Sequence, residues 1–149
     1  MIVREYDPND SERLYEILCD SLDEYFAPEM LSYFHLQWPN GQLVACDFSG
    51  KPIGFLCASK IDKDHVRIMM FAVDRNFRSF GVGSKLLVHL KRLAMMNGIK
   101  RISLEVRPSN MRAINFYKRH GFVSTEILRG YYNDGGDAVS MNLLVQLNI

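Results

Sequence analysis

The sequence predicts an α/β (α+β) fold, a mixed sheet with helices on its faces. Two observations predict it. Short apolar runs bounded by turn residues recur along the chain, and residues 42–47 and 51–60 are typical of a hairpin about Ser49-Gly50. Amphipathic segments with apolar residues at helical spacing separate other runs. Because the 149 residues contain no repeat, low-complexity stretch or linker, we expect one domain over residues 1–149.

In the first half of the chain, a strand is expected at residues 2–6. Asp7-Pro8-Asn9-Asp10 follows and suits a helix start, and the helix should run to about residue 19. The aromatic-rich residues 22–38 indicate a second helical region after a loop. The hairpin comes next, and the turn at residues 62–64 leads into a strand at residues 65–73.

In the second half, residues 82–96 are predicted to form a long helix, because Val82, Leu86 and Leu90 recur at helical spacing. Asn97-Gly98 ends this helix. A strand at residues 101–106 precedes a helix at about residues 111–120, which Gly121 ends. The last two strands are expected at residues 123–128 and 138–146.

Composition and charge narrow the classes of function. The net charge of +1 gives no sign of a polyanion-binding surface, so no specific nucleic acid partner is expected. No apolar run approaches the ~18 residues of a membrane span, and the N-terminus lacks the form of a signal peptide. We therefore expect a cytoplasmic protein with no membrane partner. The three cysteines and four histidines show no metal-ligand spacing, so no metal is expected.

The most informative stretch is Arg78-Ser79-Phe80-Gly81-Val82-Gly83, between an apolar and an amphipathic run. It predicts a strand, a glycine loop and a helix, which together gather free backbone N–H groups at the positive end of a helix dipole. The nearby cations Arg75, Arg78 and Lys85 suit a phosphate-bearing ligand. The plain alternative is an ordinary strand-to-helix loop.

Two known phosphate loops do not fit this stretch. A nucleoside-triphosphate loop requires GxxxxGK[ST], and a dinucleotide fold requires GxGxxG, but residue 86 is leucine. The remaining pattern, RxxGxG between a strand and a long helix, resembles the GCN5-related N-acetyltransferase (GNAT) superfamily. In that superfamily the equivalent loop holds the pyrophosphate of acetyl-CoA.

Three further segments resemble the N-terminal protein acetyltransferases of that superfamily, both the bacterial ribosomal-protein enzymes and the archaeal and eukaryotic catalytic subunits. Residues 104–122 match LEVRxSNxxAxxxYxxxGF, residues 130–138 are similar to YYxDGEDA, and residues 22–39 resemble LPENY…YY…WP. The segments fall in the same order and cover nearly the whole chain. The resemblance implies a single GNAT domain, with a mostly antiparallel central sheet and helices on both faces.

The resemblance also implies acetyl-CoA as co-substrate, with no metal. The strand end at residues 71–73 would bind pantetheine, because that strand splays from its neighbour in the superfamily and leaves backbone groups free. Ser79 replaces the glycine or basic residue of many members, a change that a loop binding through N–H groups should tolerate. The implied cofactor-binding residues are Phe71, Ala72, Val73, Arg78, Ser79, Phe80, Gly81, Val82, Gly83, Ser84, Asn110 and Tyr117.

Catalytic roles follow from the same resemblance. Tyr117 matches the general acid that re-protonates the departing sulfur, and a phenol pKa of ~10 is close enough to that of a thiol. Glu105 matches the general base, and Glu24 matches a second acidic position that shares this role. Each has a plain alternative: a core tyrosine, a charge on the open face of a strand, and a charge at a helix start.

On the acceptor side, Tyr131 and Tyr132 would line a peptide groove and hydrogen-bond the substrate backbone. Glu24 and Tyr25 are the other expected substrate-binding residues. The alternative is a pair of surface-loop tyrosines. Gly136 replaces the acidic residue of the DGEDA loop, on the peptide side. His65 and Arg67, on a strand near the cleft, are expected to be ordinary surface residues.

Together these residues predict an enzyme, an N-alpha-acetyltransferase that transfers acetyl directly from acetyl-CoA to protein N-termini in a ternary complex. Two alternatives stay open: a GNAT enzyme acting on a lysine side chain or small-molecule amine, and a non-catalytic acetyl-CoA-binding module. The sequence does not decide whether a ribosome or an auxiliary subunit is also a partner.

Overall fold

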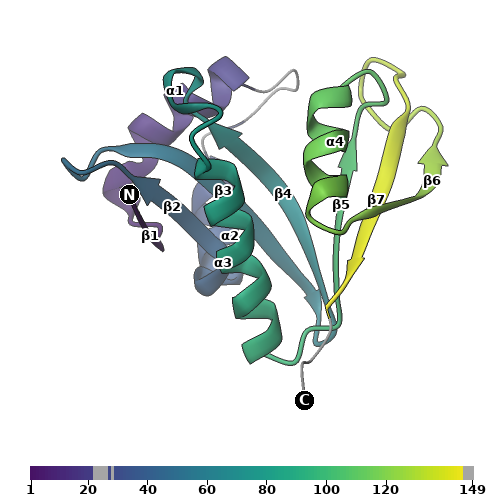
Figure 1. The fold of residues 1–149 in the computed structure, drawn as a ribbon, viewed down its shortest axis with the longest axis horizontal. Helices are drawn as coiled ribbons and strands as arrows, with labels where there is room; N and C mark the ends of the chain where they lie inside the picture. The colour runs from purple at the N-terminus through teal and green to yellow at the C-terminus, as the bar shows by residue number, and fades with distance from the viewer. Residues whose placement is uncertain (22–26, 28, 146–149) are drawn as a thin grey trace.

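The computed structural model describes residues 1–21, 27 and 29–145 (Figure 1). The expected site residues Glu24 and Tyr25 lie outside this part. Within it, seven strands form one sheet in the order β1-β2-β3-β4-β5-β7-β6. Every neighbouring pair is antiparallel except β4 and β5, which are parallel. The strands are β1 (Ile2–Glu5), β2 (Gln42–Cys46), β3 (Pro52–Asp62), β4 (His65–Val73), β5 (Arg101–Val106), β6 (Val123–Leu128) and β7 (Ala138–Leu144).

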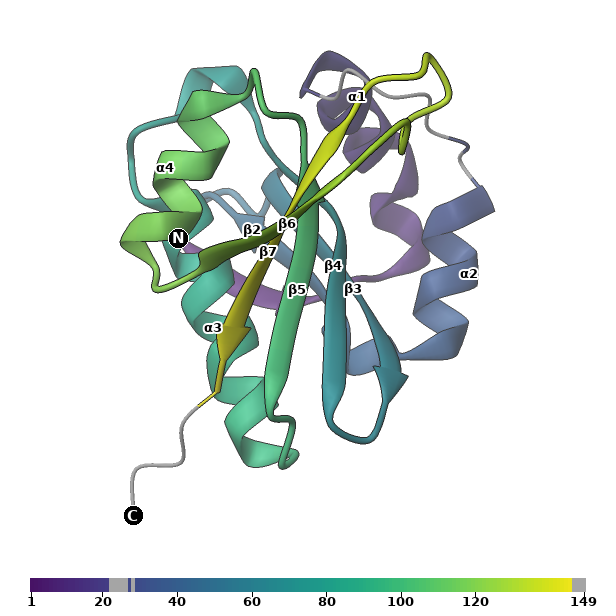
Figure 2. The ribbon, with the colours of Figure 1, turned by 90° about the vertical axis from the view of Figure 1, so that its right-hand side faces the viewer.

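Helices cover both faces of the sheet, as predicted. The pair α1 (Ser11–Ser21) and α2 (Glu29–Gln37) lies on one face, and α3 (Val82–Met96) and α4 (Met111–Arg119) lie on the other (Figure 2). The expected helix start at residues 7–10 is instead a short 3-10 turn, Pro8–Asp10, on which Asp7 and Asp10 form a capping box, and the α-helix begins after it. No helix within the described ranges is long and apolar enough to cross a bilayer.

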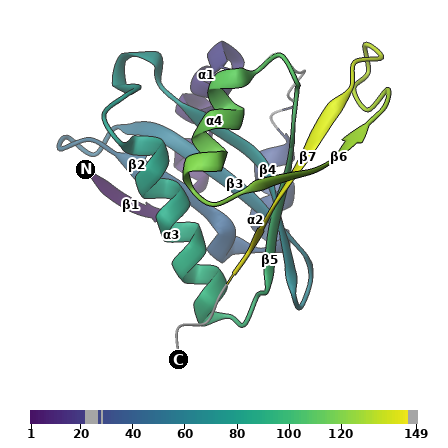
Figure 3. The same ribbon diagram turned by 45° about the vertical axis from the view of Figure 1, so that its right-hand side comes forward.

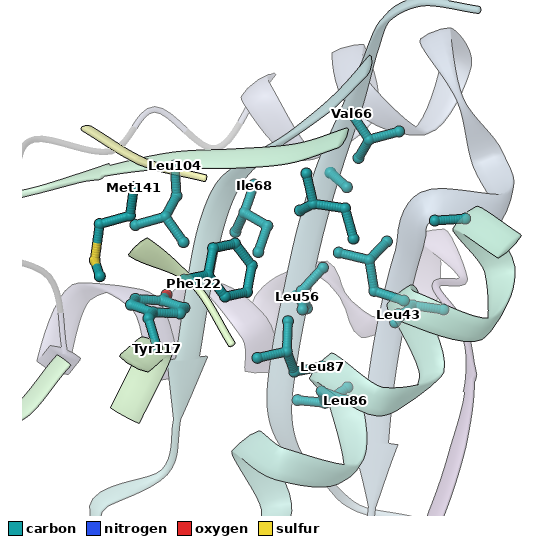
Figure 4. Close-up of a cluster of buried hydrophobic side chains, with 14 of the residues drawn as sticks. Leu43, Leu56, Val66, Ile68, Leu86, Leu87, Leu104, Tyr117, Phe122 and Met141 are labelled. Carbon is teal, nitrogen blue, oxygen red and sulfur yellow. The ribbon is translucent and has the colours of Figure 1, made fainter. Parts of the chain in front are cut away.

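Two apolar cores pack against the two faces. On one, Leu86 and Leu87 of α3 pack with Leu43 and Leu56 of the sheet (Figure 4). Burial of each such leucine contributes about 1.5–3 kcal/mol. On the other face, the helix residues Leu14, Leu18, Leu31 and Phe34 pack with the strand residues Val44 and Phe55. The cores hold α3 and α4 apart from α1 and α2, on opposite sides of the sheet.

A bulge in β4 changes which residues face each core. Cys57 of β3 pairs with Met70 and Ala58 pairs with Ile68, so Met69 is an extra residue in β4. Before the bulge, Ile68 belongs to the core under α3, and after it Phe71 packs against that same core. The bulge therefore turns Phe71 toward α3 and α4, away from the face that Met69 and Met70 occupy.

The parallel strands β4 and β5 are paired over a short length only. His65, Val66 and Arg67 pair with residues 101–103, and beyond this point the strands diverge (Figure 1). The edge of β4 from residue 68 to residue 73 is therefore not paired with β5. This is the splay that the resemblance implied, and it opens the sheet beside α4.

Candidate active site

The loop between β4 and α3 begins with a 3-10 turn, Arg75–Phe77, and continues through two left-handed residues. Ser79 has φ 70° and Gly81 has φ 81°. Gly81 is the N-cap of α3 and provides no side-chain hydrogen bond, so the N–H groups of the first helical turn have no side-chain cap. A strained loop before an uncapped helix N-terminus is a site at which backbone N–H groups can bind an anion.

A cavity of about 440 Å³ lies between this loop, the end of β4 and α4. That volume is in the range of small-molecule sites. The side chain of Phe80, an expected cofactor contact, is 73% exposed and does not line the cavity. The other expected cofactor residues all line it: Phe71, Ala72, Val73, Arg78, Ser79, Gly81, Val82, Gly83, Ser84, Asn110 and Tyr117.

The remaining lining residues are Ala113, a matched position of segment 104–122, and four residues that sequence reasoning missed, Phe77, Arg112, Phe116 and Arg119. Three of them recur at positions i, i+4 and i+7 of α4, and this spacing could have identified them as one helix face. Arg112 and Arg119 add positive charge to the cavity wall. Ser84 and the imidazole of His120 are hydrogen-bonded at 3.0 Å, which ties the first turn of α3 to the end of α4.

Tyr117 projects from α4 into the core and the cavity. It is 8% exposed, and its ring meets that of Phe122 edge-on, with centroids 5.5 Å apart (Figure 4). The ring of Phe116 also meets it edge-on, at 5.4 Å. Burial raises the pKa of Tyr117 above the ordinary value of a phenol. Tyr117 is therefore a core tyrosine that also lines the cavity, and it stays protonated near neutral pH.

Asn110 has a structural task beside its place in the cavity wall. Its side-chain oxygen accepts a hydrogen bond from the backbone N–H of Ala113 at 3.2 Å and caps α4. The cap fixes the start of the helix that carries Tyr117.

Glu105 lies on the sheet face opposite Leu104 and Val106, which belong to the core under α3. Its side chain is 17% exposed, and Arg67 Nε donates to its Oε2 at 2.9 Å. Arg67 Nη2 also donates to the Tyr131 hydroxyl. The expectation that Arg67 is an ordinary surface residue is therefore wrong: its guanidinium joins β4, β5 and the loop between β6 and β7. Opposite charges on two neighbouring strands of the sheet were the available signal.

The loop between β6 and β7 carries both tyrosines that are expected on the acceptor side, and it projects from the sheet (Figure 3). The rings of Tyr131 and Tyr132 meet edge-on with centroids 5.0 Å apart. Arg107, which follows β5, lies over the Tyr132 ring and pairs with Asp134 at 3.1 Å. A Cβ at Gly136 would stand 2.5 Å from Arg107 Nη1, so a side chain at residue 136 would require this guanidinium to shift.

The structure thus assembles two groups of expected residues. One lines the cavity on the side of α3 and α4, and the other, Glu105 with Tyr131, lies on the opposite sheet face with Arg67. The divergence of β4 and β5 opens the sheet between these two faces. In the described ranges, no cluster of three or more His, Cys, Asp or Glu side chains could hold a metal ion.

Known proteins share this chain's sequence and fold. Residues 11–122 match the Acetyltransferase (GNAT) family. The chain is 31% identical over 142 residues to an uncharacterized N-acetyltransferase of Methanocaldococcus jannaschii, which covers 95% of this chain and 90% of that protein. It is 33% identical over 129 residues to N-alpha-acetyltransferase daf-31 of Caenorhabditis elegans, which covers 80% and 69%. The crystal structure of Ard1 from Thermoplasma volcanium superposes with a TM-score of 0.94 at 38% identity, over 98% of each chain.

Proposed function

The chain belongs to the acetyltransferase (GNAT) family and is an acyltransferase, and we propose that its acceptor is the α-amine at the N-terminus of a protein. The observation that carries this proposal is the position of Glu105 and Tyr131, on the sheet face away from the cavity. A base and a hydroxyl there suit an acceptor that enters from that face, opposite the acetyl donor. The C. elegans relative named as an N-alpha-acetyltransferase supports the same acceptor.

The residues around the cavity fit acetyl-CoA. The uncapped N-terminus of α3 and the left-handed residues Ser79 and Gly81 suit its pyrophosphate. Arg112 and Arg119 suit the negative charge of the phosphate group that lies outside the pyrophosphate. The edge of β4 that is not paired with β5 offers backbone groups to the amides of the cofactor. When bound, acetyl-CoA supplies an acetyl thioester, whose carbon–sulfur bond breaks as a bond to the amine nitrogen forms.

Two side chains of the protein move the protons in this proposal. The Glu105 carboxylate accepts the proton that the amine loses, directly or through one water. A phenol is protonated at neutral pH, and burial raises the pKa of Tyr117 further; its Oη donates the proton to the departing sulfur. The α-amine, with a pKa of ~8, is already about one-tenth neutral at pH 7.

The test compares two synthetic peptides that both contain an internal lysine, one with a free N-terminus and one with a blocked N-terminus. Mass spectrometry should find one acetyl group on the free peptide, at the α-nitrogen, and none on the blocked peptide. Equal activity on the blocked peptide would overturn the proposal in favour of a lysine or small-molecule acceptor. Acetyl-CoA binding without turnover of either peptide or of small amines would instead indicate a non-catalytic module.

A further inference from the structure

We propose that Arg67 is a positioning residue of the acceptor site, which orients Glu105 and Tyr131 together and keeps the bound acceptor amine in its reactive, neutral form. This inference rests on the proposed function, because it concerns how the same site handles an α-amine. It adds a role for a residue that does not line the cavity.

The geometry shows one guanidinium bound to two groups of the acceptor site. Nε donates to Glu105 Oε2 at 2.9 Å, and Nη2 donates to the Tyr131 hydroxyl. Glu105 lies 38 residues from Arg67 in the sequence and Tyr131 lies 64 residues away. The fork of the guanidinium therefore sets the distance between a base on β5 and a hydroxyl on a projecting loop. A lysine ammonium lacks this fixed, planar fork.

Arg67 carries the main positive charge that balances the Glu105 carboxylate. Among the described residues, Glu105 has no other ion pair within 4.0 Å. His65, two residues away on β4, is hydrogen-bonded to Ser103 at 2.6 Å and to Arg101 at 3.1 Å. Burial and Arg101 lower the pKa of His65, so it is neutral near pH 7.

Across β3, the residue opposite Arg67 is also uncharged. Ser59 pairs with Arg67 in the sheet, and its hydroxyl donates to the Gln37 side chain of α2. Among the described residues, Tyr131 can also titrate, and its hydroxyl is held by Arg67 itself. Glu126 of β6 lies on the same face beyond Ser140 of β7, and it is an acid that adds no positive charge. Loss of the guanidinium would therefore leave a carboxylate with no counter-charge from the described residues in contact with it.

A carboxylate without a counter-charge would favour the acceptor as an ammonium ion, which has no lone pair for attack. With Arg67 in place, the pair is neutral overall, and the bound amine loses its proton at a lower pH. The effect should appear in the pH dependence of kcat, because kcat reports groups in the enzyme–substrate complex. The half-maximal pH of kcat/KM should not change, because kcat/KM reports groups of the free peptide and the free enzyme.

The experiment measures kcat for a free N-terminal peptide from pH 6 to 10 in Arg67→Met, Arg67→Lys and the wild type. For Arg67→Met we expect kcat to fall and its half-maximal pH to rise by about one unit. Arg67→Lys keeps the charge but not the fork, so kcat should fall while the half-maximal pH stays in place. Arg92→Met removes one exposed positive charge from α3, on the opposite side of the sheet, and is the matched control that should retain the wild-type curve.

Acetyl-CoA affinity and the melting temperature are measured for each variant, to show that it is folded. A loss of folded protein would lower the rate equally at all pH values and would not shift the half-maximal pH. A wild-type kcat curve in a folded Arg67→Met variant would overturn this inference and leave the proposed function intact. If Arg67→Met does not fold, Arg67→Lys decides: wild-type kcat in that variant overturns the positioning role. Absence of α-amine acetylation by the wild type would overturn the proposed function itself, and this inference with it.

Discussion

The guanidinium of Arg107 lies 4.1 Å from the centroid of the Tyr132 ring and joins the end of β5 to the loop between β6 and β7. Arg107 also pairs with Asp134 of that loop at 3.1 Å. A cation over an aromatic face contributes about 0.5–1 kcal/mol at an exposed site. Arg67 holds the neighbouring Tyr131 in addition. The two tyrosines that we propose to line the acceptor side are therefore each held by an arginine from the central strands or their ends.

Gly136 should be required for the contact between Arg107 and Tyr132. A Cβ at residue 136 would stand 2.5 Å from Arg107 Nη1, so Gly136→Ala forces the arginine to move. Loss of about 1 kcal/mol from this contact corresponds to a rise of about fivefold in peptide KM, with acetyl-CoA affinity unchanged. Steady-state kinetics in the Arg107→Gln background provide the control, because Gly136→Ala should have little further effect there. Additive effects on KM would contradict the coupling.

Tyr117→Phe should lower turnover without unfolding the protein. The phenylalanine ring keeps the contacts with Phe116 and Phe122, so the melting temperature and acetyl-CoA affinity should not change. Loss of a general acid typically lowers kcat by about 10²-fold. Measured kcat at saturating peptide and acetyl-CoA tests this, and wild-type turnover in the variant would remove Tyr117 from the mechanism.

The pH dependence of the wild type offers an independent test of the same side chain. In the proposed mechanism Tyr117 acts in its protonated form, and burial raises its pKa above the ordinary ~10 of tyrosine. Activity that depends on this proton is present below the raised pKa and is lost only as the pH rises through it. We therefore expect no decline of kcat between pH 7 and pH 9. A descending limb in this interval that is absent from Tyr117→Phe would show that the phenol ionises earlier than its burial implies.

Two substitutions at Gly83 should distinguish an effect on helix α3 from an effect on the space that the ligand occupies. A Cβ at Gly83 would meet Phe116 Cζ at 3.4 Å, an ordinary contact, so Gly83→Ala should bind acetyl-CoA nearly as the wild type does. The two methyl groups of Gly83→Val extend further into the cavity that Gly83 lines. We expect acetyl-CoA affinity, measured by calorimetry, to fall at least about tenfold, equivalent to about 1.4 kcal/mol. Equal affinity of the two variants would contradict the position of the ligand.

The cavity side of the site could be predicted from the sequence because its signals are local. The loop from Arg78 to Gly83 and the helix that carries Tyr117 each lie within one short segment, where glycine, capping residues and helical spacing act over a few residues. The bounds of β4, α3, β5 and β6 agree with the expected ranges for the same reason. A capping box does not distinguish a 3-10 turn from an α-helix, and α1 accordingly begins at Ser11.

The acceptor side could not be predicted to the same extent, because it depends on contacts between distant segments. Strict alternation along β4 would place Arg67 and Phe71 on one face, since they are four residues apart. The bulge at Met69 places them on opposite faces, and the residue types around Met69 do not predict a bulge. The bonds from Arg67 to Glu105 and Tyr131 follow from this register and from the path of the β6–β7 loop.

The ion pair between Arg4 and Asp10 should stabilise the N-terminal part of the fold. Arg4 Nη1 and Nη2 bind the two carboxylate oxygens at 2.7 and 2.8 Å, and Asp10 is 7% exposed. Asp10→Asn removes the charge and one acceptor, at a cost of about 1–3 kcal/mol. For a chain of this size, each kcal/mol corresponds to a fall in melting temperature of about 2–4 °C.

The pH dependence distinguishes this pair from a packing effect. Burial acts to raise the pKa of Asp10, but hydrogen bonds from Arg4 and from the Asp7 backbone N–H outweigh it and hold the pKa below its usual value. A depressed pKa contributes stability above the unfolded value of ~3.9, and this stability is lost as the pH falls through the folded pKa. The melting temperatures of wild type and Asp10→Asn should therefore differ at pH 7 and converge toward pH 3. Glu12→Gln, an exposed change in α1, is the control, and a difference that persists unchanged to pH 3 would show that Asp10 acts by packing and not by charge.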